Sequence, residues 1–246
     1  MTEQGITFIV PCYNEERRLD HTEEIFSNYF LNDTLESKVL FVNDGSDDST
    51  NTKLETVCDR LNKIKPKCAS FISYEKNCGK GYAIKRGVDV FNTEWCLTID
   101  ADMAARPHEL LVWTNKYDIN LSNKNTIYIG SREKGIDKHI VKSSWLRRNM
   151  GHVFNKLLKS ITGLKFRDTQ CGFKLYPTST ARIGFENLSD YGFAHDVEIL
   201  LKLQKENISI KTFPITWEEK PGSKVNLITD SIKMLKTVIK IRNKYK

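Results

Sequence analysis

The chain of 246 residues is predicted to fold as a single α/β domain in which a mostly parallel sheet is flanked by helices. Strand-like apolar runs alternate with helix-like segments through the first half of the sequence, and this β-α-β-α order favours a parallel sheet covered on both faces. The length suits one large domain, and no low-complexity tract separates two. Polar segments follow each of the first four strand-like runs, as expected for a ligand-binding edge.

The predicted elements follow one another in a regular order. Strand-like runs occupy residues 6–11, 38–43, 69–73 and 95–100, and helix-like segments between them occupy residues 15–31, 50–63 and 81–91. A further helix is predicted around residues 107–122, a strand at residues 126–131 and a helix at residues 196–206. In parallel sheets, ligands bind at the carboxyl ends of the strands. We therefore expect the polar segments after the first four strands to converge on one rim.

Two later segments combine apolar residues at helical spacing with many lysines and arginines. The first is residues 143–161; the second is residues 227–246, a basic amphipathic C-terminal helix that we separate from a main domain at residues 1–226. Such a helix is typically packed on a core with one solvated face. The same pattern also suits a helix that lies in a lipid interface and holds a protein on an anionic leaflet without spanning it.

The composition restricts the classes of protein and partner. Lysine and arginine (38) exceed aspartate and glutamate (31), which gives a net charge of +7 and suits nucleic acid, an anionic lipid surface or a phosphorylated substrate. The six cysteines form no C-x-x-C pair and are typical of thiols in a reducing cytosol. No apolar run approaches the roughly 20 residues that span a bilayer. The sequence therefore predicts a cytoplasmic location, with any membrane contact being peripheral on the cytoplasmic face.

Two acidic residues, Asp100 and Asp102, close the fourth strand-like run. On an extended chain, residues i and i+2 face the same way, so both carboxylates can reach one divalent cation. A hard cation held by one or two carboxylates completes its coordination with water and phosphate oxygens. The pair therefore predicts a Mg²⁺ or Mn²⁺ site for a phosphorylated donor, although two such acids alone are more often a solvated turn or a helix cap.

Two glycine-containing loops follow the second and third strands. Asp44 begins the segment at residues 44–49. A purely structural interpretation of this segment is a capped turn, whereas the functional interpretation is that Asp44 accepts a hydrogen bond from the ring N–H of a uracil or guanine. Lys80 stands between glycines at residues 77–81, before a helix whose N-terminus suits a phosphate. Several such loops on one rim predict a nucleotide site.

These motifs together resemble glycosyltransferase family 2, through residues 8–16 (FIVPCYNEE), 42–46 (VNDGS), 77–81 (NCGKG) and 100–102 (DAD). The second half resembles the branch of dolichyl-phosphate β-glucosyltransferases and dolichyl-phosphate mannose synthases, through residues 130–132 (GSR), 168–174 (DTQCGFK), 195–198 (HDVE) and 221–225 (PGSKV). The resemblance implies a GT-A fold, a nucleotide-sugar donor, a divalent metal and inversion at the anomeric carbon.

The resemblance also implies roles for individual residues. The nucleoside would contact Pro11, Tyr13, Glu15 and Asp44, and the rest of the nucleotide pocket would include Lys80. The metal diphosphate would be held by Asp100 and Asp102, and further phosphates by Arg132 and Lys224. The sugar and acceptor side would be lined by Asp168, Gln170, Asp196 and Glu198. As catalytic candidates we name Asp102, Asp196, Arg132, Asp168 and Gln170.

The implied reaction is transfer of a hexose to a polyprenyl or dolichyl phosphate, with UDP-glucose as the first donor and GDP-mannose as the second. A phosphate acceptor is already anionic near neutral pH, so its attack needs no strong general base. A sugar hydroxyl would need a carboxylate to remove its proton, with Asp196 the better candidate and Glu198 the second. Both acids could instead have a structural role at the start of a helix, where a negative charge interacts favourably with the helix dipole.

Two alternatives stay open. A family 2 enzyme could act instead on the hydroxyl of a saccharide, a glycolipid or a protein glycan. We expect no transmembrane anchor of the kind common in eukaryotic relatives, and this expectation counts against a lipid acceptor. A nucleic-acid-binding module would explain the basic charge, but the basic segments contain no aromatic stacking array, so we expect no nucleic-acid partner. His195 stands where the family more often has an aromatic residue, and Cys171 is interpreted as a buried structural thiol.

Overall fold

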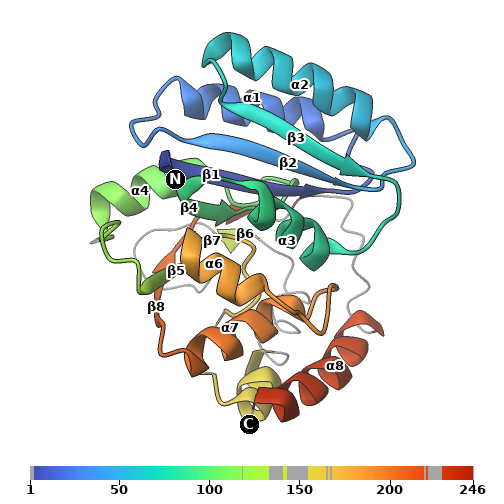
Figure 1. The fold of residues 1–246 in the computed structure, drawn as a ribbon, viewed down its shortest axis with the longest axis vertical. Helices are drawn as coiled ribbons and strands as arrows, with labels where there is room; N and C mark the ends of the chain where they lie inside the picture. Colours follow the sequence, from blue (N-terminus) through green and yellow to red (C-terminus); the bar gives the residue numbers. More distant parts are fainter. Residues whose placement is uncertain are drawn as a thin grey trace.

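The computed structural model describes residues 3–117, 119–132, 141–142, 155–164, 166, 168–218, 220 and 229–245, with the backbone alone at 141–142 and 229–232. A seven-stranded sheet forms its centre (Figure 1), with neighbouring strands in the order β3 (Ala69–Tyr74), β2 (Lys38–Asp44), β1 (Glu3–Cys12), β4 (Thr93–Thr98), β7 (Lys174–Pro177), β5 (Thr126–Ser131) and β8 (Ser209–Pro214). β7 runs antiparallel to both of its neighbours, and the other pairs in this sheet are parallel. The predicted mostly parallel sheet is therefore confirmed. A separate parallel pair consists of β6 (Val141–Lys142) and β9 (Trp217–Glu218).

Helices cover both faces of the sheet, as predicted. One face carries α1 (Leu19–Phe30), α2 (Thr50–Ile64) and α4 (His108–Lys116). The other carries α3 (Lys80–Val90), α6 (Thr178–Phe185), α7 (His195–Lys205) and α8 (Thr229–Tyr245), as Figure 1 shows. Residues 155–162 are also helical.

The core is divided into two hydrophobic clusters by the alternation of side chains along the central strands. In β1, Phe8 and Val10 face the cluster under α1, α2 and α4, whereas Ile9 faces the cluster under α3, α6 and α7. Phe41 in β2 belongs to the first cluster and Val42 to the second. Successive residues of a strand point to opposite faces, so a strand covered on both sides is apolar throughout. This explains why the first strands were easy to recognise as apolar runs.

Several predicted boundaries were wrong, for local reasons. The first helix begins at Leu19 rather than at residue 15, because residues 15–18 form a turn in which the Arg18 N–H donates to the Glu15 carbonyl at 2.8 Å. The fourth strand ends at Thr98 rather than at residue 100. α4 ends at Lys116 rather than near residue 122, because Tyr117 has extended backbone angles. The sequence analysis also did not identify β7, α6 and β8.

α8 packs its apolar face against the domain. Met234, Val238 and Ile241 lie one helical turn apart and are buried in the same cluster as α7, and Ile239 remains exposed. Packing on a core therefore accounts for the buried side of this helix. Most of the other amphipathic segment, residues 143–154, lies outside the described residues. In the described part of the chain, we find no helix with the length and hydrophobicity needed to cross a bilayer.

Candidate active site

The loops that follow the first four strands are joined to one another at the carboxyl edge of the sheet, as predicted. The loop after β1 contacts the loop after β2, because the Asp47 N–H donates to Asn14 Oδ1 at 3.0 Å. The loop after β2 contacts the loop after β3 through Asp44. The loop after β3 contacts the loop after β4 through an ion pair between Lys80 and Asp100. The four loops thus form one continuous rim.

Asp44 organises the loop that carries Lys80. Its carboxylate is buried and accepts hydrogen bonds from Tyr74 Oη at 2.7 Å, from the Cys78 N–H at 2.8 Å and from the Gly79 N–H at 2.9 Å. An acceptor that binds two successive backbone N–H groups fixes the path of the chain between them. Asp44 therefore sets the position of the N-terminus of α3, in addition to the base-binding role predicted for it.

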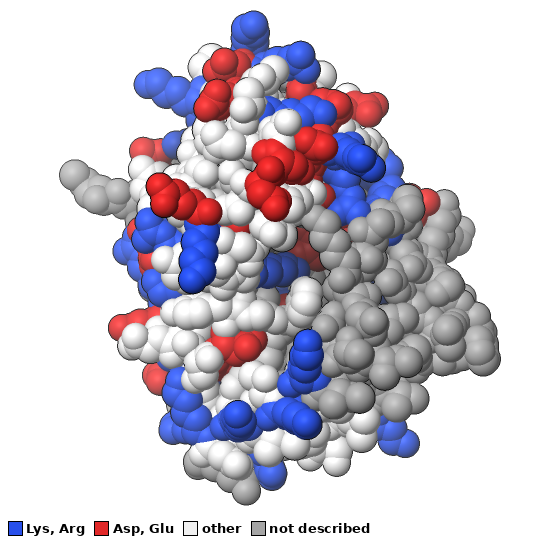
Figure 2. All heavy atoms as spheres, turned by 90° about the vertical axis from the view of Figure 1, so that its right-hand side faces the viewer, with Lys and Arg blue, Asp and Glu red and all other residues white. Residues whose placement is uncertain are grey.

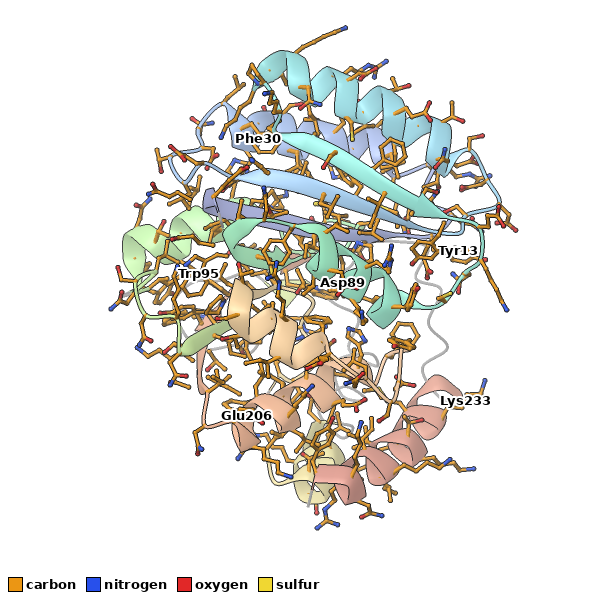
Figure 3. All side chains as sticks on the ribbon, in the orientation of Figure 1. Tyr13, Phe30, Asp89, Trp95, Glu206 and Lys233 are labelled. Atoms are coloured by element: carbon orange, nitrogen blue, oxygen red, sulfur yellow. The ribbon has the colours of Figure 1, made fainter. Side chains whose placement is uncertain are left out.

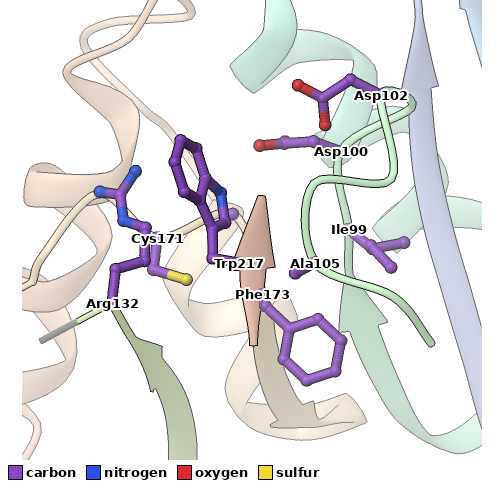
Figure 4. Close-up of a pocket in the computed structure, with 9 residues that line it drawn as sticks. Ile99, Asp100, Asp102, Ala105, Arg132, Cys171, Phe173 and Trp217 are labelled. Carbon is purple, nitrogen blue, oxygen red and sulfur yellow. The ribbon is translucent and has the colours of Figure 1, made fainter. Parts of the chain in front are cut away.

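Asp100 and Asp102 face the same pocket, although not for the predicted reason. They lie in a turn beyond the end of β4, in which the Met103 N–H donates to the Asp100 carbonyl at 3.1 Å and Met103 has a φ of 53°. Figure 4 shows both carboxylates on one side of a pocket whose other wall includes Arg132 and Trp217. A turn, rather than an extended strand, therefore brings the two acids together.

The chemistry of this acidic pair fits a divalent cation. Burial, and next the charge of Asp100, raise the pKa of Asp102 above its usual range. Two neighbouring carboxylates that disfavour each other's charge are stabilised by a shared cation. Among the described residues no cluster of three or more metal-ligating side chains exists. Two carboxylates, with the remaining positions left to water and phosphate, are the arrangement that Mg²⁺ commonly uses.

Lys80 contacts this acidic pair directly. Its Nζ lies 2.5 Å from Asp100 Oδ1. Burial acts to lower the pKa of Lys80, but the charges of Asp100 and Asp196 outweigh it and raise the pKa. Lys80 is therefore a firmly charged ammonium at the N-terminus of α3, where the helix dipole adds to its attraction for anions.

The predicted residues Arg132 and Asp168 form a pair with each other. Arg132 donates from Nε and Nη2 to the two carboxylate oxygens of Asp168, both at 2.7 Å, and its backbone N–H donates to Asp168 Oδ2 at 3.0 Å. The guanidinium also lies over the ring of Trp217, 5.4 Å from the ring centre. Burial would raise the pKa of Asp168, but Arg132 holds it below its usual range. Asp168 thus fixes the position of a cationic wall that faces the acidic pair.

Asp196 is engaged by a lysine that the sequence analysis did not identify. Lys174 is fully buried, and its Nζ lies 2.6 Å from Asp196 Oδ1 and 2.5 Å from the Cys171 carbonyl oxygen. Burial would raise the pKa of Asp196, but Lys174, together with His195 and Lys80, lowers it. A carboxylate with a depressed pKa, already bound by an ammonium, is a weak proton acceptor.

Glu198, the second candidate base, has a structural role. Its side chain is fully buried and accepts hydrogen bonds from the Ser189 N–H at 2.8 Å, Lys244 Nζ at 3.1 Å and Tyr245 Oη at 3.0 Å. These contacts join the start of α7 to the last turn of α8. Burial opposes the effect, but the hydrogen bonds from Ser189 and Lys244 lower the pKa of Glu198.

Cys171 is buried, as predicted, and His195 is buried as well, so it is not a solvated histidine. His195 Nδ1 lies 2.5 Å from the Gly192 carbonyl oxygen, and its Nε2 lies 3.6 Å from Asp196 Oδ1. Burial lowers the pKa of His195, which favours the neutral ring. Burial raises the pKa of Cys171 to about 12, so the thiol is not a nucleophile at neutral pH.

The remaining predicted residues lie at different distances from the acidic pair. Gln170 donates from Nε2 to Met234 Sδ at 3.0 Å and so contacts α8. Pro11, Tyr13 and Glu15 follow one another at the carboxyl end of β1, where Figure 3 shows Tyr13 at the rim. Lys224 lies outside the described residues. The structure therefore brings the acidic pair, Lys80, Arg132 and Asp196 together and leaves Lys224 untested.

The absence of a side chain at Gly172 leaves room for the Asp100 carboxylate, because a methyl group at residue 172 would lie 2.5–2.7 Å from it. We expect Gly172→Ala to weaken Mn²⁺ binding by about tenfold or more, since the flexible Asp100 side chain must move away. Little change in the melting temperature is expected. Gly163→Ala is the control, because its added methyl meets nothing within 4 Å but its φ is 73°. That variant should lose stability and keep Mn²⁺ affinity, as measured by calorimetry; unchanged Mn²⁺ binding in Gly172→Ala would contradict the prediction.

Comparison with known proteins places these observations in a wider context. Residues 7–182 match the sequence profile "Glycosyl transferase family 2". The chain is 33% identical to the dolichyl-phosphate beta-glucosyltransferase of Dictyostelium discoideum, with 98% of this chain and 74% of that protein covered. It is 31% identical to the protein of the same name from Saccharomyces cerevisiae and 30% identical to that of Homo sapiens, with 98% of this chain and 75% of each relative covered.

Solved structures share the fold at lower sequence identity. Glucosyl-3-phosphoglycerate synthase from Mycobacterium tuberculosis, in complex with UDP, superimposes with a TM-score of 0.66 at 13% identity and covers 98% of this chain and 80% of its own. Mannosyl-3-phosphoglycerate synthase from Rubrobacter xylanophilus has a TM-score of 0.66 at 14% identity, with 98% and 73% covered. These likenesses concern the fold, and they confirm the predicted GT-A architecture.

Proposed function

Because this chain belongs to glycosyl transferase family 2, we propose that it transfers glucose from UDP-glucose to a polyprenyl phosphate with inversion at the anomeric carbon. The relatives that match it over nearly its whole length are named dolichyl-phosphate beta-glucosyltransferases. A fold neighbour is described in complex with Mn²⁺ and UDP-glucose. These names support the choice of a glucosyl donor and a lipid phosphate acceptor.

The observation that carries the choice of acceptor is the state of the two candidate bases. Asp196 is bound by Lys174 at 2.6 Å, and Glu198 accepts hydrogen bonds from four other residues. Neither carboxylate is poised to remove a proton from a sugar hydroxyl. An acceptor that is already anionic requires no such step. The geometry therefore favours a phosphate over the hydroxyl of a saccharide or a protein glycan.

Different residues of the rim would bind the nucleoside, the diphosphate, the metal and the acceptor in the proposed reaction. Asp44 and the residues after β1 would hold the nucleoside, and Lys80 would attract the diphosphate. A Mg²⁺ or Mn²⁺ held by Asp100 and Asp102 would neutralise charge on the departing nucleoside diphosphate. Arg132, held in place by Asp168, would orient the anionic acceptor. The acceptor oxygen forms a bond to the anomeric carbon while the bond from that carbon to the diphosphate breaks on the opposite face.

We also propose that α8 contacts an anionic membrane surface through its basic residues. Lys233, Lys236, Lys240 and Arg242 lie on a helix whose apolar face is packed on the domain. Figure 2 looks onto the carboxyl edge of the sheet and shows a row of lysines and arginines along the lower part of this face. Basic residues near an anionic leaflet each contribute about 1 kcal/mol of attraction. Such contact would bring the enzyme to a membrane-embedded acceptor.

The proposed function predicts a donor- and metal-dependent glycolipid product. We expect radiolabelled glucose from UDP-glucose, but not mannose from GDP-mannose, to appear on a short polyprenyl phosphate in detergent. The product should require Mg²⁺ or Mn²⁺ and disappear with a chelator. Simple saccharides and glycolipids with free hydroxyl groups serve as the matched acceptors. Transfer to these acceptors, with none to polyprenyl phosphate, would overturn the lipid-phosphate assignment and favour the hydroxyl alternative.

A further inference from the structure

A mostly apolar groove lies between α8 and the segment that leads into α7. It is lined by Gly192, Phe193, Ala194, Lys233, Met234 and Thr237. Phe193 leaves 46% of its surface exposed, whereas Ala194 and Met234 form the buried floor. The groove thus combines an apolar lining with a few polar groups at its edge, as small-molecule sites commonly do.

Two hydrogen bonds link residues of the groove to residues near the candidate active site. Met234, on its floor, accepts a hydrogen bond through Sδ from Gln170 Nε2 at 3.0 Å. Gly192, at its other wall, contacts His195 through its carbonyl oxygen, and His195 directly precedes Asp196. The groove therefore lies next to the segment that leads to His195 and Asp196.

The charges around the groove suit a ligand with an apolar body and an anionic end. Lys233 is exposed and stands at the edge of the groove on α8. Asp190 also lines it, but its carboxylate accepts a hydrogen bond from the Ala194 N–H at 2.9 Å, just before α7. Figure 3 shows Lys233 and Tyr13 on the same side of the molecule, so the edge of the groove that carries Lys233 lies on the side of the rim.

The size of the groove restricts what it can hold. The groove is open to solvent and has a volume of about 180 Å³. A five-carbon isoprene unit needs about 150 Å³, if each carbon takes the roughly 30 Å³ that a water occupies in the liquid. A second protein would have to cover several hundred Å² of surface on each partner, which such a groove cannot offer alone. One branched hydrocarbon unit is therefore the occupant that matches both its volume and its lining.

We propose that this groove binds the isoprene unit next to the phosphate of the lipid acceptor, with Lys233 attracting the anionic end of the acceptor toward the rim, where Arg132 would orient it. The inference rests on the proposed function, because it assigns a position to the acceptor of that reaction. Phe193 packs on the isoprene unit, and Met234 and Ala194 form the floor beneath it. The rest of the polyprenyl chain leaves the groove, so the protein recognises the start of the chain and not its full length.

The first test compares acceptor kinetics in Phe193→Ser with those in a matched control. The control is Leu31→Ser, because Leu31 is 71% exposed and follows Phe30, which Figure 3 places on the opposite side of the molecule from Lys233. We expect Phe193→Ser to raise the KM for citronellyl phosphate by about tenfold relative to the KM for UDP-glucose, as loss of one buried apolar contact predicts. Leu31→Ser should leave both values unchanged. Equal KM ratios in wild type and Phe193→Ser, in folded protein, would overturn the groove assignment.

A second test does not depend on turnover. A citronellyl phosphate that carries a diazirine on its first isoprene unit is photolysed with wild-type protein, and the labelled peptides are identified by mass spectrometry. Label on the peptides that contain Phe193 or Met234 supports the groove, whereas label confined to other peptides overturns it. Label in the groove without glucosyl transfer to any polyprenyl phosphate would retain the groove and reject the proposed function. Glucosyl transfer together with label confined to other peptides would retain the proposed function and reject the groove.

Discussion

Replacing Asp102 with asparagine is expected to reduce glucosyl transfer by about a thousandfold while leaving the protein at least as stable as the wild type. Charge stabilisation by a metal is worth several kcal/mol, and each 1.36 kcal/mol is a factor of ten in rate. The variant loses a carboxylate whose pKa burial and Asp100 already raise. Removing its charge relieves an unfavourable interaction in the folded state. Activity and stability should therefore move in opposite directions.

Three measurements check this expectation: the rate of product formation, the affinity for Mn²⁺ and the melting temperature. The matched control is Asp89→Asn, because Asp89 pairs with Lys85 at 2.6 Å on the partly exposed side of α3 and does not line the acidic pocket. An exposed pair of this kind contributes about 0–1 kcal/mol to stability. The control should keep both transfer and Mn²⁺ affinity. Asp102→Asn that retains more than a tenth of wild-type transfer, or that binds Mn²⁺ normally, would contradict the proposed metal site.

Replacing Lys174 with methionine is expected to lower the free energy of unfolding by about 3–5 kcal/mol at neutral pH, because it leaves the buried Asp196 charge without its partner. In wild type, Lys174 outweighs burial and keeps the pKa of Asp196 below its usual range. Without Lys174, burial raises that pKa. A raised pKa stabilises the folded protein at low pH and costs stability as the pH increases through it. The destabilisation should therefore be largest at pH 7 and smaller near pH 4.

The double variant Lys174→Met/Asp196→Leu tests whether the single variant loses stability because Asp196 is left unpaired or because the packing around residue 174 has changed. Replacing both members of a buried ion pair by apolar residues is often neutral or stabilising, so we expect it to recover most of the lost free energy in urea unfolding. Transfer should stay low in the double variant, since Asp196 belongs to the predicted acceptor side. Equal destabilisation in the single and double variants, or a loss that does not depend on pH, would contradict the role given to the pair.

The first half of the fold could be predicted because its signals are local. The sequences of β1, β2, β3 and β4 are apolar runs, and the segments between them have apolar residues at helical spacing. Polar residues mark the carboxyl end of each run. The boundaries were less certain, because a turn that begins at Glu15 or a left-handed residue such as Met103 leaves no periodic pattern. Short elements such as β7, with four residues, cannot be distinguished from a loop by periodicity.

The pairings within the site could not be predicted, because they join residues that are distant in the sequence. Arg132 and Asp168 were both named as ligand-binding residues, yet they bind each other across 36 positions. Lys174 meets Asp196 only because antiparallel β7 delivers it beneath the start of α7. A lysine in the apolar run Phe173-Lys174-Leu175 was the available signal, since a lysine is almost never fully buried without a partner. Trp217 left no comparable signal, because it follows β8 as an isolated aromatic residue.

The ion pair between Lys80 and Asp100 has a consequence for the order in which ligands can bind. A divalent cation that takes Asp100 as a ligand must displace an ammonium that lies 2.5 Å from it. Part of the metal's binding free energy is therefore spent on breaking this contact, and the displaced lysine becomes available to the diphosphate of the donor. Metal and donor would then favour each other's binding, and by thermodynamic linkage this coupling would be reciprocal. In the proposed reaction, Lys80 would thus act as an exchangeable counter-ion that keeps the acidic pair partly neutralised until a donor binds with its metal.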